Sequence, residues 1–136
     1  MLPGLATDRC LVMGVVNVTP DSFSDGGKWL DAATAIRHGV ELAQSGADLV
    51  DVGGESTRPG AIRIDTEEEL RRVLPVIEGL VSEGVRVSVD TMRAVTARRA
   101  LDAGAELLNV VSGGRADPDM MAVAAGAGCP IVLMHW

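Results

Sequence analysis

The stretch ADLVDVGGESTRPGA, residues 47–61, contains the pattern on which our prediction of the fold depends. An apolar run at Leu49 to Val52 leads directly into a long polar loop that is rich in glycine. Four further apolar runs occur along the chain: Leu11 to Val16, Val85 to Val89, Leu107 to Val111 and Ile131 to Met134. Because near-continuous runs of this kind are typical of strands in parallel sheets, the sequence predicts five such strands.

Amphipathic helical patterns lie between the predicted strands. Apolar residues at spacings of three and four predict helices over Ala33 to Ala43 and over Leu70 to Val81. Val95 to Leu101 gives a shorter pattern, and Met120 to Ala125 a weak one. Strands that alternate with helices through short links predict parallel pairing by right-handed crossovers. An open doubly wound sheet and a (β/α)8 barrel both satisfy this α/β pattern.

Local signals predict where the helices begin and end. Thr66 and Glu69 have the spacing of a capping box, and Pro75 predicts either a kink or a helix that begins nearer to the proline. Three glycines fall where helix ends favour a left-handed residue: Gly46, Gly84 and Gly104. Cys10 and Cys129 are not spaced as a metal or redox motif, and we expect both to be buried as small hydrophobic residues.

Charge and composition exclude several classes of partner. The chain has 136 residues and a formal net charge of -7, without a conspicuous cluster of Lys and Arg. That charge would repel the phosphate backbone of a nucleic acid. The apolar runs are far too short to cross a bilayer. We therefore expect a cytoplasmic protein that binds small molecules, with no nucleic-acid or membrane partner.

Polar residues close almost every predicted strand: Asn17, Asp51 with Glu55, Asp90, Asn109 and His135. Each alone could cap the turn or helix that follows. In both candidate folds, however, ligands bind at the carboxyl ends of the strands, where the longer links also lie. We therefore expect these side chains to line one pocket. A carboxylate beside an amide can there bind the donor and acceptor edge of a flat heterocycle.

Two long loops complete the expected site. Residues 17–27, NVTPDSFSDGG, offer oxygen ligands of the kind that Mg2+ prefers. Residues 53–61, GGESTRPGA, combine glycines and hydroxyl groups with Arg58, whose guanidinium group matches phosphate oxygens. The simpler interpretation of residues 17–27 is a solvated polar loop, and that of Arg58 is a surface ion pair. Together the loops predict a site for a diphosphate held with Mg2+.

The runs MGVVNVTPDSFSDGG (13–27) and DVGGESTRPGA (51–61) resemble the two signature stretches of the dihydropteroate synthase family. SVDTMR (88–93) fits its third strand, and the similarity, of an actinobacterial type, continues through VSGGRADP (111–118) and VLMHW (132–136). The resemblance implies a (β/α)8 TIM barrel, of which the chain supplies about the first five strands with four helices. Residues 1–136 would be the amino-terminal part of a single pterin-binding domain.

The resemblance also implies the roles of individual residues. Asp90 and Asn109 would hold the pterin ring, and Asn17 would coordinate Mg2+. Thr57 would meet the substrate near its diphosphate. Three residues would wall the pocket for p-aminobenzoate and sulfonamides: Phe23, Arg58 and Pro59. A full-length member is expected to form a homodimer.

The implied reaction belongs to folate biosynthesis. It condenses 6-hydroxymethyl-7,8-dihydropterin diphosphate with p-aminobenzoate and gives 7,8-dihydropteroate and diphosphate. The diphosphate would leave with help from Mg2+, a stabilised cation would form, and the arylamine would attack that cation. No covalent enzyme intermediate is needed.

Two features depart from the family pattern. A closed barrel typically needs about 250 residues, so the chain, which stops after its fifth predicted strand, is expected to be inactive alone. Asn109 is followed by Val110, where the family usually has Asp. If Asn109 faces the barrel interior, Val110 faces the helices and can pack there. The missing carboxylate bears on the geometry of the first loop and the fourth strand.

Two alternative functions remain open from the sequence. A pterin-binding methyltransferase domain uses a similar barrel to hold methyl-tetrahydrofolate. The segments SFSDGG (22–27) and STRPG (56–60) favour the synthase, because a methyl donor has no diphosphate to hold. The other alternative is a truncated half-barrel that acts as an interaction module, which the length and Val110 both favour.

Overall fold

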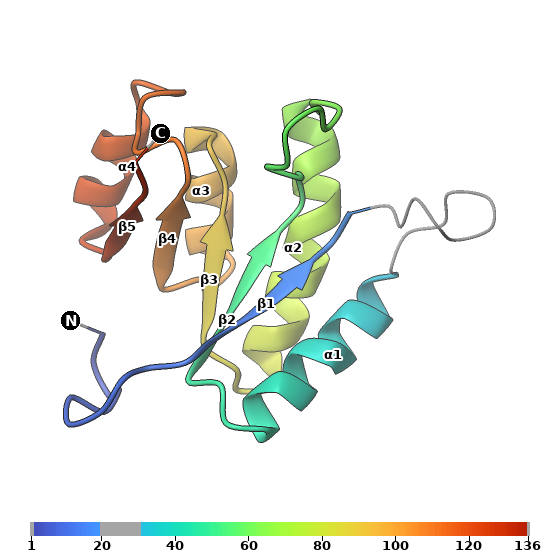
Figure 1. The fold of residues 1–136 in the computed structure, drawn as a ribbon, viewed down its shortest axis with the longest axis vertical. Helices are drawn as coiled ribbons and strands as arrows, with labels where there is room; N and C mark the ends of the chain where they lie inside the picture. The colour runs from blue at the N-terminus through green and yellow to red at the C-terminus, as the bar shows by residue number, and fades with distance from the viewer. Residues whose placement is uncertain (1, 20–30, 136) are drawn as a thin grey trace.

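The computed structural model describes residues 2–19 and 31–135. In this part of the chain five strands alternate with four helices, in the predicted order (Figure 1). The elements are β1 (Met13–Asn17), α1 (Ala32–Gln44), β2 (Leu49–Gly53), α2 (Thr66–Ser82), β3 (Val87–Asp90), α3 (Ala94–Asp102), β4 (Leu107–Val110), α4 (Met120–Ala127) and β5 (Ile131–Leu133).

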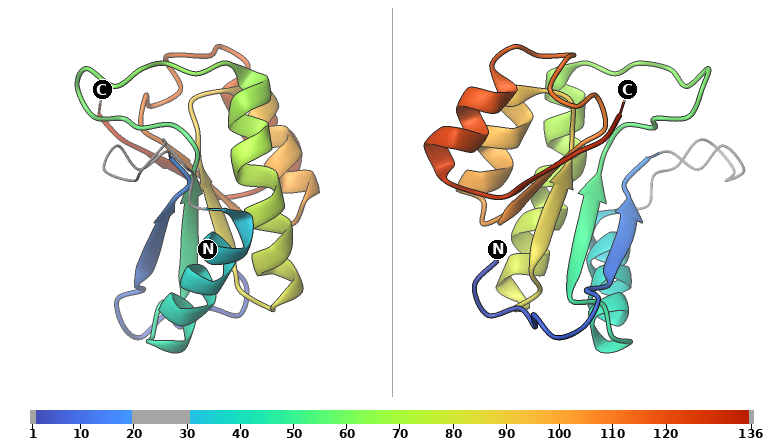
Figure 2. Two further views of the ribbon diagram at one scale, coloured as in Figure 1. Left: turned by 90° about the vertical axis from the view of Figure 1, so that its right-hand side faces the viewer. Right: turned by 60° about the vertical axis from the view of Figure 1, so that its left-hand side comes forward.

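The strands form one sheet in the order β1-β2-β3-β4-β5, and each neighbouring pair is parallel. The four helices lie against the same face of this sheet (Figure 2). A doubly wound sheet would reverse its strand order and place helices on both faces. Sequential order with helices on one face is the arrangement of a (β/α)8 barrel, of which the described strands form an open part. The barrel prediction is confirmed.

The two faces of the sheet differ in chemistry. Successive residues of a strand point to opposite faces. The helix-covered face is aliphatic, and its side chains are at most 1% exposed: Val16, Val50, Val52, Val87, Val89, Leu108 and Val110. Burial of each such side chain contributes roughly 1.5 to 3 kcal/mol. The helix-free face carries polar residues at alternating positions: Asn17, Asp51, Ser88, Asp90 and Asn109.

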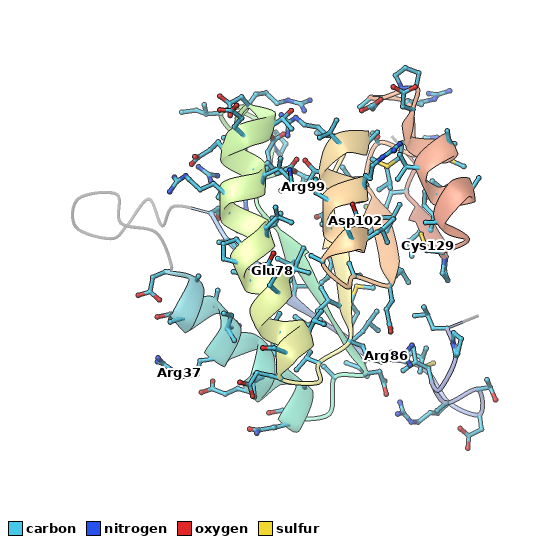
Figure 3. The ribbon with its side chains drawn as sticks, turned by 180° about the vertical axis from the view of Figure 1, so that it is seen from behind. Arg37, Glu78, Arg86, Arg99, Asp102 and Cys129 are labelled. Carbon is cyan, nitrogen blue, oxygen red and sulfur yellow. The ribbon has the colours of Figure 1, made fainter. Side chains whose placement is uncertain are left out.

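Two glycines allow α1 and α2 to approach closely. A Cβ atom added at Gly79 would lie 2.2 Å from Cδ1 of Ile36, and one added at Gly39 would lie 2.6 Å from Cδ2 of Leu80. Both helices therefore need a residue without a side chain at their contact. The outward faces of the helices carry charged groups, including Arg37 of α1 and Glu78 of α2 (Figure 3).

Helix α2 begins differently from the prediction. Asp65 is its N-cap, and Oδ1 of Asp65 accepts a hydrogen bond from the backbone N–H of Glu68 over 2.8 Å. The capping box predicted from Thr66 and Glu69 is wrong, because the Glu69 side chain is buried against β3 and α3. A helix start nearer to Pro75 is also wrong. Burial of Val73, Val76, Ile77 and Leu80 around the proline holds α2 together despite its missing N–H group. The kink remains a prediction.

Other local predictions have mixed outcomes. Gly46, Gly84 and Gly104 have positive φ angles of 117°, 78° and 110°, as predicted. Cys10 is exposed, so its predicted burial is wrong: β1 begins at Met13 and leaves Cys10 in the segment before the strand. Cys129 is half-buried. Within residues 2–19 and 31–135, no helix has the length and apolar character needed to span a membrane.

Candidate functional site

The carboxyl ends of three strands bring Asn17, Asp90 and Asn109 into one row. Asn17 pairs with Gly53, Gly53 with Asp90, and Asp90 with Asn109. Paired residues of parallel strands point to the same side, so the three side chains share the helix-free face. A Cβ atom at Gly53 would lie 3.5 Å from Oδ2 of Asp90 and 3.8 Å from Oδ1 of Asn17. The glycine thus leaves open space between an amide and a carboxyl group.

Asp51 lies beneath this row and supports it. It occupies the middle of β2, not the strand end where we expected it, and is 3% exposed. Its carboxylate accepts hydrogen bonds from Oγ of Ser88 and, over 3.1 Å, from Nδ2 of Asn109. Burial raises the pKa of Asp51 above its ordinary value, although the bonds from Ser88 and Asn109 oppose the shift. Asp51 therefore orients the Asn109 carboxamide.

Asp90 is the carboxyl group of the row, and its surroundings perturb its pKa strongly. Burial raises its pKa from 3.8 to about 7, and the nearby charges of Asp51 and Glu69 act in the same direction. Its carboxyl group makes no hydrogen bond to another described residue. An acid that is partly buried, has no partner among the described residues and has a pKa raised to about 7 can accept hydrogen bonds from a ligand, and those bonds would stabilise its ionised form.

The loop between β2 and α2 reaches beyond the carboxyl edge of the sheet (Figure 2). Thr57, Arg58 and Pro59 lie in it and are exposed. Arg58 forms no ion pair with any residue in the described part of the chain. The simpler interpretation of Arg58 as a surface ion pair therefore finds no partner within residues 2–19 and 31–135, and its guanidinium group is available to an anion.

Some expected site residues lie elsewhere. The carboxylate of Glu55 does not face the row, because it pairs with Nη1 of Arg93 over 2.9 Å and its side chain is only 6% exposed. His135 is exposed beyond the end of β5, and the β5 residue paired with Asn109 is Val132, so the polar row ends at β4. Phe23 lies outside the described residues.

Asn17 offers an oxygen of the kind that a hard cation can take as one of few protein ligands. Asn17 is exposed and its carboxamide oxygen borders the space at Gly53. The described residues contain no group of three or more His, Cys, Asp and Glu side chains that could hold a metal ion. Mg2+ commonly takes one or two protein oxygens and completes its shell with phosphate oxygens and water, a mode of binding that Asn17 can support.

Sequence reasoning missed Asp51 and Ser88 as the layer that supports Asn109. The available signal was their alternation: Asp51 stands two residues before Gly53, and Ser88 two residues before Asp90. A spacing of two places both on the face that carries the site. The near-continuous appearance of the apolar runs hid this signal.

Comparison with known proteins agrees with the geometry. Residues 13–136 match the family of pterin-binding enzymes. The chain is 57% identical over 125 residues to the dihydropteroate synthase of Mycobacterium leprae, covering 92% of this chain and 44% of that protein. The dihydropteroate synthase of Xanthomonas albilineans with 4-aminobenzoic acid superimposes with a TM-score of 0.87 at 53% identity, covering 94% of this chain and 47% of that one. Its complex with 7,8-dihydropteroate gives a TM-score of 0.82 at 48% identity, covering 96% and 47%. The chain thus spans about half the length of these relatives, and it belongs to the family of pterin-binding enzymes.

Proposed function

We propose that the protein is a dihydropteroate synthase, which joins 6-hydroxymethyl-7,8-dihydropterin diphosphate to p-aminobenzoate. The observation that carries this proposal is the row of Asn17, Asp90 and Asn109 on the helix-free face, beside an exposed loop that bears Thr57 and Arg58. The synthase identity of the similar proteins supports the same reaction.

Asp90 and Asn109 would bind the pterin ring. A carboxylate at Asp90 accepts hydrogen bonds from the paired N–H groups on one edge of the ring. Nδ2 of Asn109 is engaged by Asp51, which leaves the amide oxygen of Asn109 to accept from the same ring. Without such donors the pKa of Asp90 is raised to about 7. Hydrogen bonds from ligand N–H groups would stabilise the ionised carboxylate and so lower this pKa.

The diphosphate would lie between the first strand and the loop after β2. Arg58 is exposed, and its planar guanidinium group can bind two phosphate oxygens at once. Thr57, next to it, offers a hydroxyl donor. Asn17 would supply a carboxamide oxygen to Mg2+, and the bound ion would neutralise charge on the departing diphosphate.

In the reaction, the bond between the pterin methylene carbon and the diphosphate oxygen breaks, and the electron pair leaves with the diphosphate. The methylene carbon becomes electron-poor, and the ionised carboxylate of Asp90 stabilises the positive charge that spreads into the ring. The arylamine nitrogen then bonds to this carbon and loses a proton. Arg58 and Pro59, with Phe23, would wall the pocket that holds the arylamine, which is also where sulfonamides would compete.

The remaining parts of the proposal concern assembly and location. A homodimer of the full-length protein and a cytoplasmic location are predictions that follow from the family resemblance and the composition.

The test is a titration of the full-length protein with the pterin diphosphate in the presence and absence of Mg2+, followed by an assay for dihydropteroate with p-aminobenzoate. We expect binding that strengthens with Mg2+ and a product that requires both substrates. Binding of methyl-tetrahydrofolate without binding of the diphosphate would instead support the methyltransferase alternative. Failure to bind either ligand would support the interaction module.

A further inference from the structure

Glu69 is a buried carboxylate on α2 and is only 1% exposed. It accepts hydrogen bonds from Oγ1 of Thr91 over 3.0 Å, from Oγ1 of Thr96 over 2.6 Å and from Nη1 of Arg93 over 3.2 Å. A carboxylate removed from water costs several kcal/mol unless it is paired and hydrogen-bonded. This one has three partners, two in the turn between β3 and α3 and one in α3, so it fixes the position of Arg93.

Arg93 uses its guanidinium group to close the base of the loop between β2 and α2. Nη1 lies 2.9 Å from Oε2 of Glu55, at the start of the loop. Nη2 donates to the backbone carbonyl of Ile64, at its end. The backbone N–H of Ile64 in turn donates to Oε2 of Glu55 over 3.3 Å. One side chain from outside the loop therefore ties its two ends together, and Thr57, Arg58 and Pro59 lie between those ends.

Arg93 also belongs to the segment that carries Asp90. Only Thr91 and Met92 separate the two residues, and Oγ1 of Thr91 accepts a hydrogen bond from the backbone N–H of Arg93 over 3.1 Å. The backbone that places the carboxyl group of Asp90 in the row thus also places the guanidinium group that holds the loop. The distance between the loop and the residues that would bind the ring therefore depends on this short segment.

We infer that Arg93 is a positioning residue: held by buried Glu69, it clamps Glu55 and Ile64 so that Thr57 and Arg58 meet the phosphate end of a ligand whose ring lies on Asp90 and Asn109. This inference deepens the proposed function and rests on it for the identity of the ligand. The alternative is that the cluster only stabilises the fold. That alternative predicts equal effects on every ligand, whereas the clamp predicts a loss confined to the phosphate end.

The test compares two variants in the full-length protein. Glu55→Gln removes the ion pair that joins the start of the loop to Arg93 and leaves the buried pair of Arg93 and Glu69 intact, so it tests the clamp without an unpaired charge in the interior. Arg93→Lys keeps the charge but cannot bridge three groups as a planar guanidinium group does. Arg86→Met is the matched control, because Arg86 pairs with Glu106 over 2.6 Å and binds the carbonyl of Pro3 at the opposite edge of the sheet.

Two ligands separate the two ends of the site: 6-hydroxymethylpterin, which lacks phosphate, and its diphosphate with Mg2+. We expect Glu55→Gln and Arg93→Lys to weaken binding of the diphosphate by about tenfold while leaving the affinity for the unphosphorylated pterin within about twofold. The Arg86→Met control should change neither affinity. Equal losses for the two ligands, or no loss for either, would overturn the inference.

A readout without ligand separates this inference from the proposed function. Hydrogen exchange of the backbone N–H of Ile64, followed by mass spectrometry of the segment 54–65, reports whether the base of the loop is closed. We expect faster exchange in Glu55→Gln and Arg93→Lys and an unchanged rate in Arg86→Met. If the wild-type protein binds neither pterin, the proposed function is wrong. If the exchange rate of the Ile64 N–H is unchanged in both variants, the clamp is wrong, whatever the ligand.

Discussion

Nδ2 of Asn109 lies 3.1 Å from Oδ2 of Asp51 and donates a hydrogen bond to it, so a buried acid on β2 sets the orientation of an amide on β4. The acid is 3% exposed and also accepts from Ser88. The oxygen of Asn109 is thereby left for a ligand. The row of Asn17, Asp90 and Asn109 consequently depends on a lower layer of polar groups, which a ligand bound to the row would not need to contact.

Asp51→Asn tests this dependence. A carboxamide has one acceptor oxygen for the two donors that Asp51 now serves, so the orientation of Asn109 is lost in part. We expect affinity for 6-hydroxymethylpterin to fall by about tenfold. Loss of a buried hydrogen bond should also lower stability by about 1 kcal/mol, a cost that is partly offset because burial disfavours the charge of Asp51 and raises its pKa. Calorimetric titration and thermal unfolding measure the two effects, and an unchanged affinity would contradict the supporting role.

The pKa of Asp90 predicts a pH dependence of binding. With a pKa of about 7 the acid is mostly protonated at pH 6 and mostly ionised at pH 8. If the pterin ring binds the ionised form, affinity should rise about tenfold from pH 6 to pH 8. Titrations across this range in the wild type and in Asp90→Asn check this, and the variant should bind weakly with no such rise. A wild-type affinity that is flat over these two pH units would exclude an ionised Asp90 as the acceptor.

The same shift predicts a pH dependence of stability with the opposite sign. The pKa of Asp90 is higher in the folded protein than the ordinary 3.8, so between about pH 4 and pH 7 the folded state holds a proton that the unfolded state has released. The free energy of unfolding should therefore fall as pH rises through this window, by about 3 kcal/mol between pH 5 and pH 8 from this group. Urea unfolding at pH 5 and pH 8 measures it. In Asp90→Asn the decrease in the free energy of unfolding between pH 5 and pH 8 should be smaller by that amount.

Gly53→Ala tests the open space between Asn17 and Asp90. The added Cβ atom would meet Cβ of Asp90 at 3.4 Å and Oδ2 of Asp90 at 3.5 Å, which are ordinary contacts, so the fold should tolerate it. The methyl group would nevertheless occupy the space that a ligand needs. We expect an unfolding temperature within a few degrees of the wild type and a clear loss of pterin affinity. If this variant kept the wild-type affinity for the pterin, ligands would not occupy the space between the side chains of Asn17 and Asp90.

Val110→Asp introduces the acid that the family resemblance led us to expect after Asn109. Val110 is fully buried on the helix-covered face, among aliphatic side chains. An acid there needs a partner, and without one it costs roughly 2 to 4 kcal/mol of stability. Val95→Asp on α3 is the matched control, because Val95 is 57% exposed and should tolerate the same change. Equal stability of the two variants would mean that the protein supplies a partner at position 110.

The sequence predicted most of the strands and helices, because the spacing of apolar residues indicates which side chains are buried. The strands around Val50 and Leu108 and the helices around Ile36 and Ile77 follow from apolar spacing alone, and the structure differs mainly at their ends. Val110 facing the helices also followed from the alternation of a strand. The choice of barrel over doubly wound sheet did not follow from spacing, because both folds alternate strand and helix. It came from the resemblance and is confirmed by strand order and by the single helix layer.

The site was less predictable, because several of its polar residues bind one another. Glu55 appeared in the sequence as one more acid at the mouth, yet it pairs with Arg93. Glu69 appeared as a capping residue, yet it is buried and holds Thr91, Thr96 and Arg93. Such pairs join residues more than twenty positions apart, and no local pattern distinguishes a paired acid from a ligand-binding one.

The alternation of valine with polar residues in β3 has a consequence for folding itself. A displacement of this strand by one residue would turn Val87 and Val89 outward and push Ser88 and Asp90 beneath the helices. A carboxylate left unpaired among aliphatic side chains is expensive enough to reject such a misaligned sheet. The polar side chains that would bind the ligand therefore also favour the correct register of the strands during folding.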